Sequence, residues 1–515
     1  MPGPRPGVAA ACAAALAGGV LYALGYLGYG LWPCLLVFLT PLWWALDRLR
    51  ARRLGPALAG FAFGLGAYAA GFRFLWHLLD PFLGGRAALG AALWVGYGLW
   101  FAAGFAAYGA VVALVRRRGW PLAAAAIPPL LVLEWLQLLV FPLYAGGALV
   151  LAPLWAQSAD LGGPLLLTAL LAGANVVAYE TTAWRRGRRP RPRAVWAAAL
   201  VVAAAVPLYG TRRVAAVDAT VRAAPRLRLG IVQANLDTAD RDTVGVRTHR
   251  RHLAETRALL DAAPLDLVVW PESAYVRGIR RPLPVSGRPI LGDLAGRGVP
   301  LLFGGSSVVE VDGRRRRYNS ALLVGADGTI RDAYDKNLLI PLAEVAPFAE
   351  LVPGVARWFP EVQEFRAAAT TPALRLGRWR LATPICYEAI RPEFVRRMVA
   401  TARPHLLVTL ANDAWFGASQ EPWIHLQLAR LRAIEHRRFL VRATNSGISA
   451  IVDPAGRLVA RTGAQTRATL VGEVRPLAGT TVYARLGDWP GWLAAGLVVL
   501  TLATRPRRHP AARSA

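Results

Sequence analysis

The chain has 515 residues, of which 55% are hydrophobic, and its mean hydropathy is +0.36. A chain of this length has room for two or more domains, and this composition argues against a purely soluble globular protein. The formal net charge of +29 would suit a nucleic-acid-binding protein if the basic residues gathered on one folded domain. The positions of the basic residues therefore decide whether the charge indicates nucleic-acid binding.

Long apolar runs separated by short polar loops occupy residues 1–211. Most of them reach the roughly 20 residues that a helix needs to cross a bilayer. We predict seven transmembrane helices, at about 7–25, 29–46, 56–79, 88–115, 120–142, 162–181 and 194–211. An eighth run, at 489–503, contains two tryptophans, which favour a membrane–water interface. Because a second run follows almost at once, the first is expected to be a span and not a cleaved signal peptide.

Arginine clusters flank the predicted spans on one side only. They comprise Arg5 and the segments 47–53, 116–118, 185–193 and 505–513, whereas loops such as 80–86 carry almost no basic residues. The positive-inside rule then predicts that both termini are cytoplasmic and that residues 212–488 lie outside the cytoplasm. We interpret these arginines as topological anchors and therefore predict no nucleic-acid partner.

The segment 212–488 has the pattern of an α/β domain. Short β-rich runs lie at 227–236, 265–273, 300–311, 318–325, 382–388 and 405–413, and helical patterns lie at 247–263 and 423–438. The basic stretch 314–317 is expected to be the solvated start of a strand. We therefore divide the chain into a membrane domain (1–211), an extracytoplasmic catalytic domain (212–488) and a last transmembrane helix with a basic cytoplasmic tail (489–515).

Three ionisable residues follow apolar strands in the α/β domain: Glu272, Lys336 and Cys386. A thiol attacks as the thiolate, a buried carboxylate with a raised pKa can take its proton, and a lysine can stabilise an oxyanion. Together they would perform acyl transfer through a thioester.

Each of these residue types is, taken singly, more often structural than catalytic, but Lys336 is unusual. It is the one lysine among the 60 basic residues, so Arg fills the other basic positions. A compact ammonium differs from a planar guanidinium mainly in a tight pocket. By contrast Cys12 and Cys34 lie in apolar runs and read as small hydrophobes. Three scattered cysteines make neither a zinc site nor a disulfide framework, and we predict no metal and no cofactor.

The motifs VVWPESA, YDKNLLIPLAE and ICYE, in that order, resemble the Glu-Lys-Cys triad of the carbon–nitrogen hydrolase (nitrilase) superfamily. With its spans, the whole chain resembles the membrane branch of that superfamily, the apolipoprotein N-acyltransferase family. The segments LANDAWFG (410–417) and RATNSGISAIVDPAGR (442–457) are also similar to that branch. The resemblance implies a four-layer αββα sandwich attached to about eight transmembrane helices.

The resemblance also implies roles for the matching residues. Glu272 would be the general base, Lys336 the oxyanion-stabilising cation and Cys386 the nucleophile. Glu344 would be a second essential acid. Tyr387 and Glu388 would shape the pocket, and Trp415 would contact the acyl chain or headgroup, although a packed core Trp is an equal alternative.

The implied reaction has two steps. Cys386 would take an acyl chain from a membrane phospholipid, with phosphatidylethanolamine as the expected donor. The thioester would then acylate the α-amino group of the N-terminal S-diacylglyceryl-cysteine of a lipoprotein, in the bacterial cytoplasmic (inner) membrane. One stretch departs from the family pattern: QANLDTADRDT (233–243) replaces a QGN stretch followed by a Lys-Trp pair.

Two other functions remain open from the residues. A membrane-tethered amidase or nitrilase would pass its acyl group to water, although one span would suffice to anchor it. A transporter with an outer binding domain would use ionisable groups in or near the spans, such as Arg73, His77 and Glu134. A transporter would also be expected to show repeat symmetry, and none is found.

Overall fold

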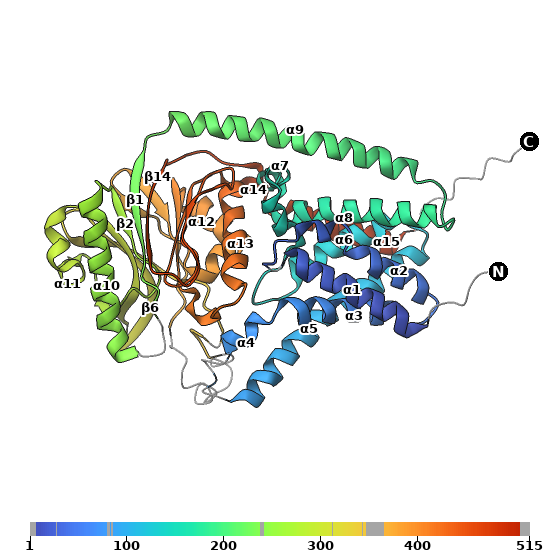
Figure 1. The fold of residues 1–515 in the computed structure, drawn as a ribbon, viewed down its shortest axis with the longest axis horizontal. Coiled ribbons are helices and arrows are strands. Elements are labelled where there is room, and N and C mark those ends of the chain that lie inside the picture. The colour runs from blue at the N-terminus through green and yellow to red at the C-terminus, as the bar shows by residue number, and fades with distance from the viewer. Residues whose placement is uncertain are drawn as a thin grey trace, which may run out of the picture.

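The computed structural model describes residues 7–26, 28–79, 83, 86–236, 241–311, 313–341, 343–346 and 365–504. A helical domain lies on the right of Figure 1 and an α/β domain on the left. Helix α1 (Val8–Tyr26) begins, and helix α15 (Trp489–Ala503) ends, on the side of the helical domain that faces away from the α/β domain (Figure 1).

Most helices of the helical domain overlap the predicted apolar runs. Besides α1 and α15 they are α2 (Leu39–Leu49), α3 (Gly55–Gly71), α4 (Phe74–Leu79), α5 (Ala87–Arg117), α6 (Leu122–Leu136), α7 (Pro153–Ala156), α8 (Ala159–Arg185) and α9 (Arg193–Ala223), with the 3₁₀ helices η1 (Trp32–Leu36) and η3 (Ala145–Leu151). By length and composition α1, α5, α8 and α9 can cross a membrane, and α6 and α15 are shorter apolar helices. Several helices that could span a membrane are thus present, while the count of eight stays a prediction.

Several helices differ in extent from the predicted runs. The run 29–46 is divided between η1 and α2, and the run 56–79 between α3 and α4. Helix α6 ends at Leu136, before the predicted end at 142, whereas α9 continues beyond the predicted domain boundary at 211. Hydropathy shows only which segments are apolar. Backbone breaks and helix continuation depend on packing and on hydrogen bonds that the apolar pattern does not contain.

Glycines bring α1, α3 and α5 into backbone contact. A Cβ added to Gly60 of α3 would lie 2.0 Å from the carbonyl oxygen of Phe105 in α5, and one on Gly19 of α1 would lie 2.0 Å from that of Phe63 in α3. Lipid-facing helices gain little from hydrophobic burial, so close approach through small residues is their main means of packing. These glycines therefore determine how the helical domain is assembled.

The α/β domain contains two sheets. The first has the order β14-β1-β2-β5-β6-β7-β4, with β3 paired to β5, and the second has the order β13-β12-β11-β10-β9-β8. Neighbouring strands β1 and β2, and β10 and β11, are parallel. The strands are β1 (Leu227–Gln233), β2 (Leu267–Val269), β3 (Tyr275–Arg280), β4 (Val285–Ser286), β5 (Leu301–Val311), β6 (Arg314–Val324), β7 (Thr329–Asp335), β8 (Leu374–Leu376), β9 (Trp379–Ala382), β10 (Leu406–Ala411), β11 (Leu440–Thr444), β12 (Ala450–Val452), β13 (Leu458–Arg461) and β14 (Ala468–Val474).

Helices cover the outer faces of both sheets (Figure 1). On the first lie α10 (Arg241–Ala262), α11 (Arg288–Leu291) and η4 (Gly292–Arg297), and on the second lie α12 (Pro392–Ala402) and α13 (Glu421–His436), with α14 (Val482–Leu486) nearby. Buried side chains from both sheets, such as Ile231 and Val408, form one core. The expected αββα layering is confirmed.

One predicted strand is wrong in part. The run 382–388 is not a single strand, because β9 ends at Ala382 and Cys386 begins the 3₁₀ helix η6 (Cys386–Ile390). The apolar residues before Cys386 are apolar because they are buried, as Ile385 is, and not because they continue the strand. The basic stretch 314–317 does begin β6, and its side chains are exposed as predicted.

Helix α13 joins the two domains because it is buried on two sides. Leu426 and Ala433 pack into the core of the sandwich, whereas Ile424 and Leu428 pack into the core of the helical domain. At its end, Arg437 Nη2 lies 2.7 Å from Asp160 Oδ2 of α8. Breaking a buried ion pair by removing one partner leaves an uncompensated charge, so this contact holds the domains in one orientation.

We expect Gly60→Leu to destabilise the protein, because the added side chain meets the backbone of Phe105. Overpacking of this kind typically costs about 1–3 kcal/mol. Gly96→Leu on α5 is the matched control, since a Cβ there meets nothing within 4 Å. The thermal unfolding midpoint in detergent should fall for Gly60→Leu and not for Gly96→Leu. Equal midpoints would contradict the proposed packing.

Candidate active site

Lys336 is buried between two carboxylates. It directly follows β7, and its side chain is 1% exposed. Its Nζ lies 2.8 Å from Glu344 Oε2 and 3.3 Å from Glu272 Oε1. Burial lowers its pKa, but Glu272 and Glu344 outweigh that effect and raise it above the ordinary value, so the ammonium stays charged. Three of the predicted site residues therefore meet at one point.

Glu272 reaches this point because the chain after β2 lies directly on β5. A Cβ added to Gly304 of β5 would lie 2.5 Å from the Cα of Glu272, so this close approach requires glycine. Burial raises the pKa of Glu272, and the repulsion of Glu344 adds to this, while Lys336 lowers it. A carboxylate with a raised pKa is suited to accept a proton near neutral pH.

Asn319 of β6 links the two carboxylates. Its Nδ2 donates to Glu272 Oε1 at 2.7 Å and to Glu344 Oε1 at 2.8 Å, and its backbone carbonyl accepts from the backbone N–H of Lys336. Asn319 was not predicted from the sequence. An amide inside an apolar strand, YNSALLV, is the signal that could have found it.

Cys386 sits at a sharp turn where β9 gives way to η6. Its φ is +49°, an uncommon conformation for a non-glycine residue and one often found at functional sites. The residue is 5% exposed. Burial raises the pKa of its thiol, the charge of Glu272 raises it further, and Lys336 lowers it. A raised pKa favours the neutral thiol, which needs a proton acceptor before it can attack.

Glu388 ties the cysteine turn to the lysine loop. Its Oε2 accepts from the Tyr334 hydroxyl (2.7 Å) and the Ile385 N–H (2.8 Å). Its Oε1 accepts from the backbone N–H groups of Asn337 (2.6 Å) and Leu338 (3.0 Å). Burial raises its pKa to about 7, although these hydrogen bonds oppose the rise. Glu388, which was predicted to shape the pocket, thus accepts hydrogen bonds with both carboxylate oxygens and connects the two loops that carry Lys336 and Cys386.

A second buried cluster stands next to Cys386. His425 Nε2 is 3.2 Å from the Cys386 carbonyl oxygen, and its Nδ1 is 3.0 Å from Asp413 Oδ1. Arg442 donates to Asp413 Oδ2 at 2.6 Å. Burial raises the pKa of Asp413, but Arg442 and His425 prevail and lower it to about 2. These residues were not predicted, although the polar NDAW stretch after a strand marked Asp413.

The ligand atoms of Cys386, Asp413 and His425 lie within 4.8 Å of one another, which is close enough to hold a metal ion. The chemistry of the cluster does not favour this. Arg442 already neutralises Asp413, and Lys336 contributes a further positive charge to the surroundings of Cys386. These two fixed positive charges repel a divalent cation.

The remaining predicted residues face the helical domain. Tyr387 and Trp415 are partly buried and pack against its core. The Tyr387 ring lies 6.3 Å from that of Phe141, and the ring of Phe416, in η7 (Asp413–Phe416), lies 5.9 Å from it. An apolar wall shared by both domains therefore begins next to Cys386.

The ionisable residues that suggested a transporter have other surroundings. Arg73 and His77 are exposed. Glu134 accepts a hydrogen bond from Thr168 Oγ1 (2.6 Å) and from the backbone N–H of Ala145 (2.9 Å), so it fastens η3 to α6 and α8. Part of the divergent loop 233–243, residues 237–240, lies outside the described residues.

Known proteins match both domains. The carbon–nitrogen hydrolase family model matches residues 228–482, and the model of the apolipoprotein N-acyltransferase N-terminal domain matches residues 18–177. The chain is 34% identical to the apolipoprotein N-acyltransferase of Azotobacter vinelandii, over 97% of this chain and 96% of that protein. It is 32% identical to that of Bradyrhizobium diazoefficiens, over 96% and 95%. Among solved structures it is similar to Saccharomyces cerevisiae Nit3 of the nitrilase superfamily (18% identity, TM-score 0.37), over 49% of this chain and 90% of that one.

We expect Glu388→Gln to lower stability, because an amide offers one acceptor oxygen where four donors converge. Each buried donor left without a partner costs about 1–3 kcal/mol. Glu310→Gln, at an exposed position of β5, is the control and should be close to neutral. The measurement is the thermal unfolding midpoint of both variants, and a shift of equal size in the two would rule out the bridging role.

Proposed function

Since this chain belongs to the apolipoprotein N-acyltransferase family, we propose that it transfers an acyl chain from a membrane phospholipid to the α-amino group of the N-terminal S-diacylglyceryl-cysteine of lipoproteins, through a thioester on Cys386. Phosphatidylethanolamine is the expected donor. Relatives with the same name over nearly the full chain favour this function over a hydrolase or a transporter.

The observation that carries the proposal is the position of the cysteine turn against the helical domain. The Tyr387 ring packs with Phe141 of that domain, and the Phe416 ring packs with Phe141 and Phe74. A lipid acyl chain can follow such an apolar wall from the bilayer to the sulfur without entering water. Apolar walls also slow hydrolysis of a waiting thioester.

In the first step Glu272 takes the proton of the Cys386 thiol while the sulfur attacks the ester carbonyl carbon. Lys336 stabilises the negative charge that develops on the carbonyl oxygen. The C–O bond then breaks, Glu272 returns the proton to the departing oxygen, and a lysophospholipid leaves. Burial of Glu272, which raises its pKa, supports its assignment as the base.

In the second step the lipoprotein amine attacks the thioester carbon. Glu272 accepts a proton from the amine, the new C–N bond forms and the C–S bond breaks. The proton passes to the departing sulfur, which restores the thiol. Glu344 holds Lys336 in place throughout, because its carboxylate makes the shorter of the two contacts with Nζ.

The membrane orientation is part of the proposal. The arginine-rich ends of α2, α5 and α8 lie at the end of the helical domain that faces away from the α/β domain (Figure 1). If those ends are cytoplasmic, the α/β domain stands outside the cytoplasm, next to the leaflet that holds both substrates. We also propose that residues 1–211, 212–488 and 489–515 are three functional units.

Incubation of the purified protein with phospholipid should produce an acyl adduct on Cys386, detected by mass spectrometry. A diacylglyceryl-cysteine peptide should discharge the adduct quickly, and water should discharge it slowly. The control Cys34→Ala should form the adduct normally, whereas Cys386→Ala should form none. Rapid discharge by water alone would instead identify a hydrolase, and no adduct on the wild-type protein would refute the thioester route.

Lys336→Arg should reduce acyl-enzyme formation by roughly a hundredfold or more, the usual effect of losing an oxyanion donor. A guanidinium is larger and planar, and does not fit the 2.8 Å and 3.3 Å contacts that the ammonium makes. The control is Arg331→Lys, an exposed position on β7, which should keep the wild-type rate. The initial rate of adduct formation is measured for both, and a near-normal rate for Lys336→Arg would remove its assigned role.

A further inference from the structure

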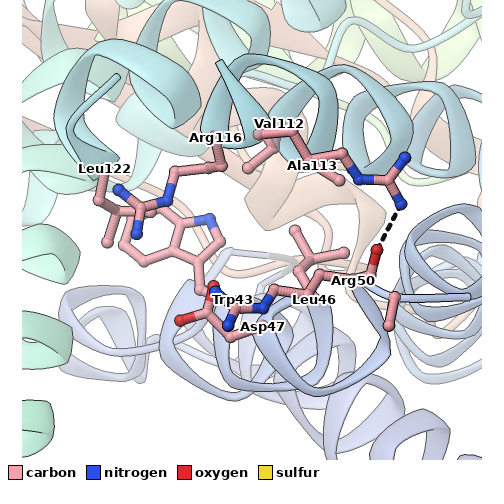
Figure 2. A pocket seen from close by; sticks show the side chains of 10 residues that line it. Trp43, Leu46, Asp47, Arg50, Val112, Ala113, Arg116 and Leu122 are labelled. Carbon is pink, nitrogen blue, oxygen red and sulfur yellow. Dashed lines mark hydrogen bonds between the residues drawn. The ribbon is translucent and has the colours of Figure 1, made fainter. Parts of the chain in front are cut away.

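A pocket of about 390 Å³ lies at the end of the helical domain farther from Cys386. It opens between the last turns of α2 and α5 and the start of α6. Its basic lining residues are Arg50, Arg116 and Arg117, of which Figure 2 labels Arg50 and Arg116 together with the apolar residues Trp43, Leu46 and Leu122. Its volume is in the usual range for small-ligand sites.

The positive charge of this pocket is not neutralised within the described residues. Arg116 donates to the carbonyl oxygen of Trp120, and Arg117 donates to that of Arg50, so neither of these contacts involves a carboxylate. No ion pair of these three arginines with an acid occurs in the described part of the chain. Peptide carbonyls leave the charge of a guanidinium largely uncompensated, so the pocket attracts anions.

The one acid of the pocket is already bonded elsewhere. Asp47 Oδ2 accepts from the Tyr179 hydroxyl at 2.6 Å and pairs with Arg189 Nη2 at 2.9 Å. Arg189 also pairs with Glu180. Because Arg189 is shared between Asp47 and Glu180, one negative charge remains behind the pocket and attracts Arg116. The three arginines at the rim outweigh it by two positive charges.

The floor of the pocket is apolar. Trp43, Leu46, Val112 and Leu122 line it, and all four are buried. The Trp43 Nε1–H donates to the Tyr108 hydroxyl at 2.9 Å, so the indole presents no free donor. A cationic rim above an apolar floor matches a molecule with an anionic head and an apolar stem.

We propose that this pocket binds the phosphodiester of an anionic phospholipid in the leaflet opposite the α/β domain. The phosphate would lie among Arg50, Arg116 and Arg117, and the glycerol and first methylenes would cover the floor. Free phosphate shares the head chemistry but makes no contact with the apolar floor. Basic pockets between membrane helices are a common means of lipid recognition.

The test measures phosphatidylglycerol bound to the purified full-length protein by native mass spectrometry, over a range of lipid concentrations. Arg50→Gln/Arg117→Gln should bind it roughly tenfold more weakly. Arg52→Gln/Arg53→Gln removes the same charge from exposed positions outside the pocket and should bind as the wild-type protein does. If phosphatidylglycerol binding were weakened equally in both double variants, the lipid would respond to the overall basic charge and not to the pocket, and the proposal would be overturned.

Two further arms decide between ligands and guard against misfolding. Ala113→Phe narrows the pocket while keeping every arginine, and should also weaken phosphatidylglycerol binding. Wild-type affinity in that variant would contradict the proposal, whatever the arginine pair does. Displacement of the lipid by millimolar inorganic phosphate would assign the site to a free anion and not to a lipid. Phosphatidylcholine, which has no net charge, should bind more weakly than phosphatidylglycerol.

Discussion

The buried ammonium of Lys336 is the constraint on which the α/β domain depends. A charge away from water is tolerated only when opposite charges and hydrogen bonds surround it. Glu272 and Glu344 supply the charges, and each lies on a different segment of the chain. Folding of two distant segments, around Glu272 and around 336–344, is therefore coupled to pairing one cation, and the same pairing would prepare the groups for the proposed proton transfer and oxyanion stabilisation.

The surrounding polar residues fix the positions of the carboxylates and of the sulfur relative to one another. Asn319 spans Glu272 and Glu344, and Glu388 joins the lysine loop to the turn that carries Cys386. Gly304 allows the chain of Glu272 to lie on β5. Each of these residues acts through another, so they position the site and do not perform its chemistry.

The helical domain packs directly against the site and also anchors it. Helix α13 contributes to both cores, and the wall formed by Tyr387, Phe416 and Phe141 starts at the cysteine turn. The proposed thioester would need a dry environment and an acyl donor that arrives from the bilayer. The apolar wall between the helical domain and the cysteine turn would meet both needs, and a single anchoring span would not.

The sequence by itself indicated an α/β domain next to a domain of apolar helices, and its resemblance to a known family implied the αββα class and the candidate site residues. Apolar length, strand patterns and motif order are local properties, and the single lysine among many arginines was visible without coordinates. Only the tertiary structure decided that Asn319, Asp413 and His425 join the site, that Glu388 lies behind it, and that Glu134 fastens a loop. It also decided where α3, α6 and α9 end. These features depend on contacts between residues far apart in the chain, which a local pattern does not record.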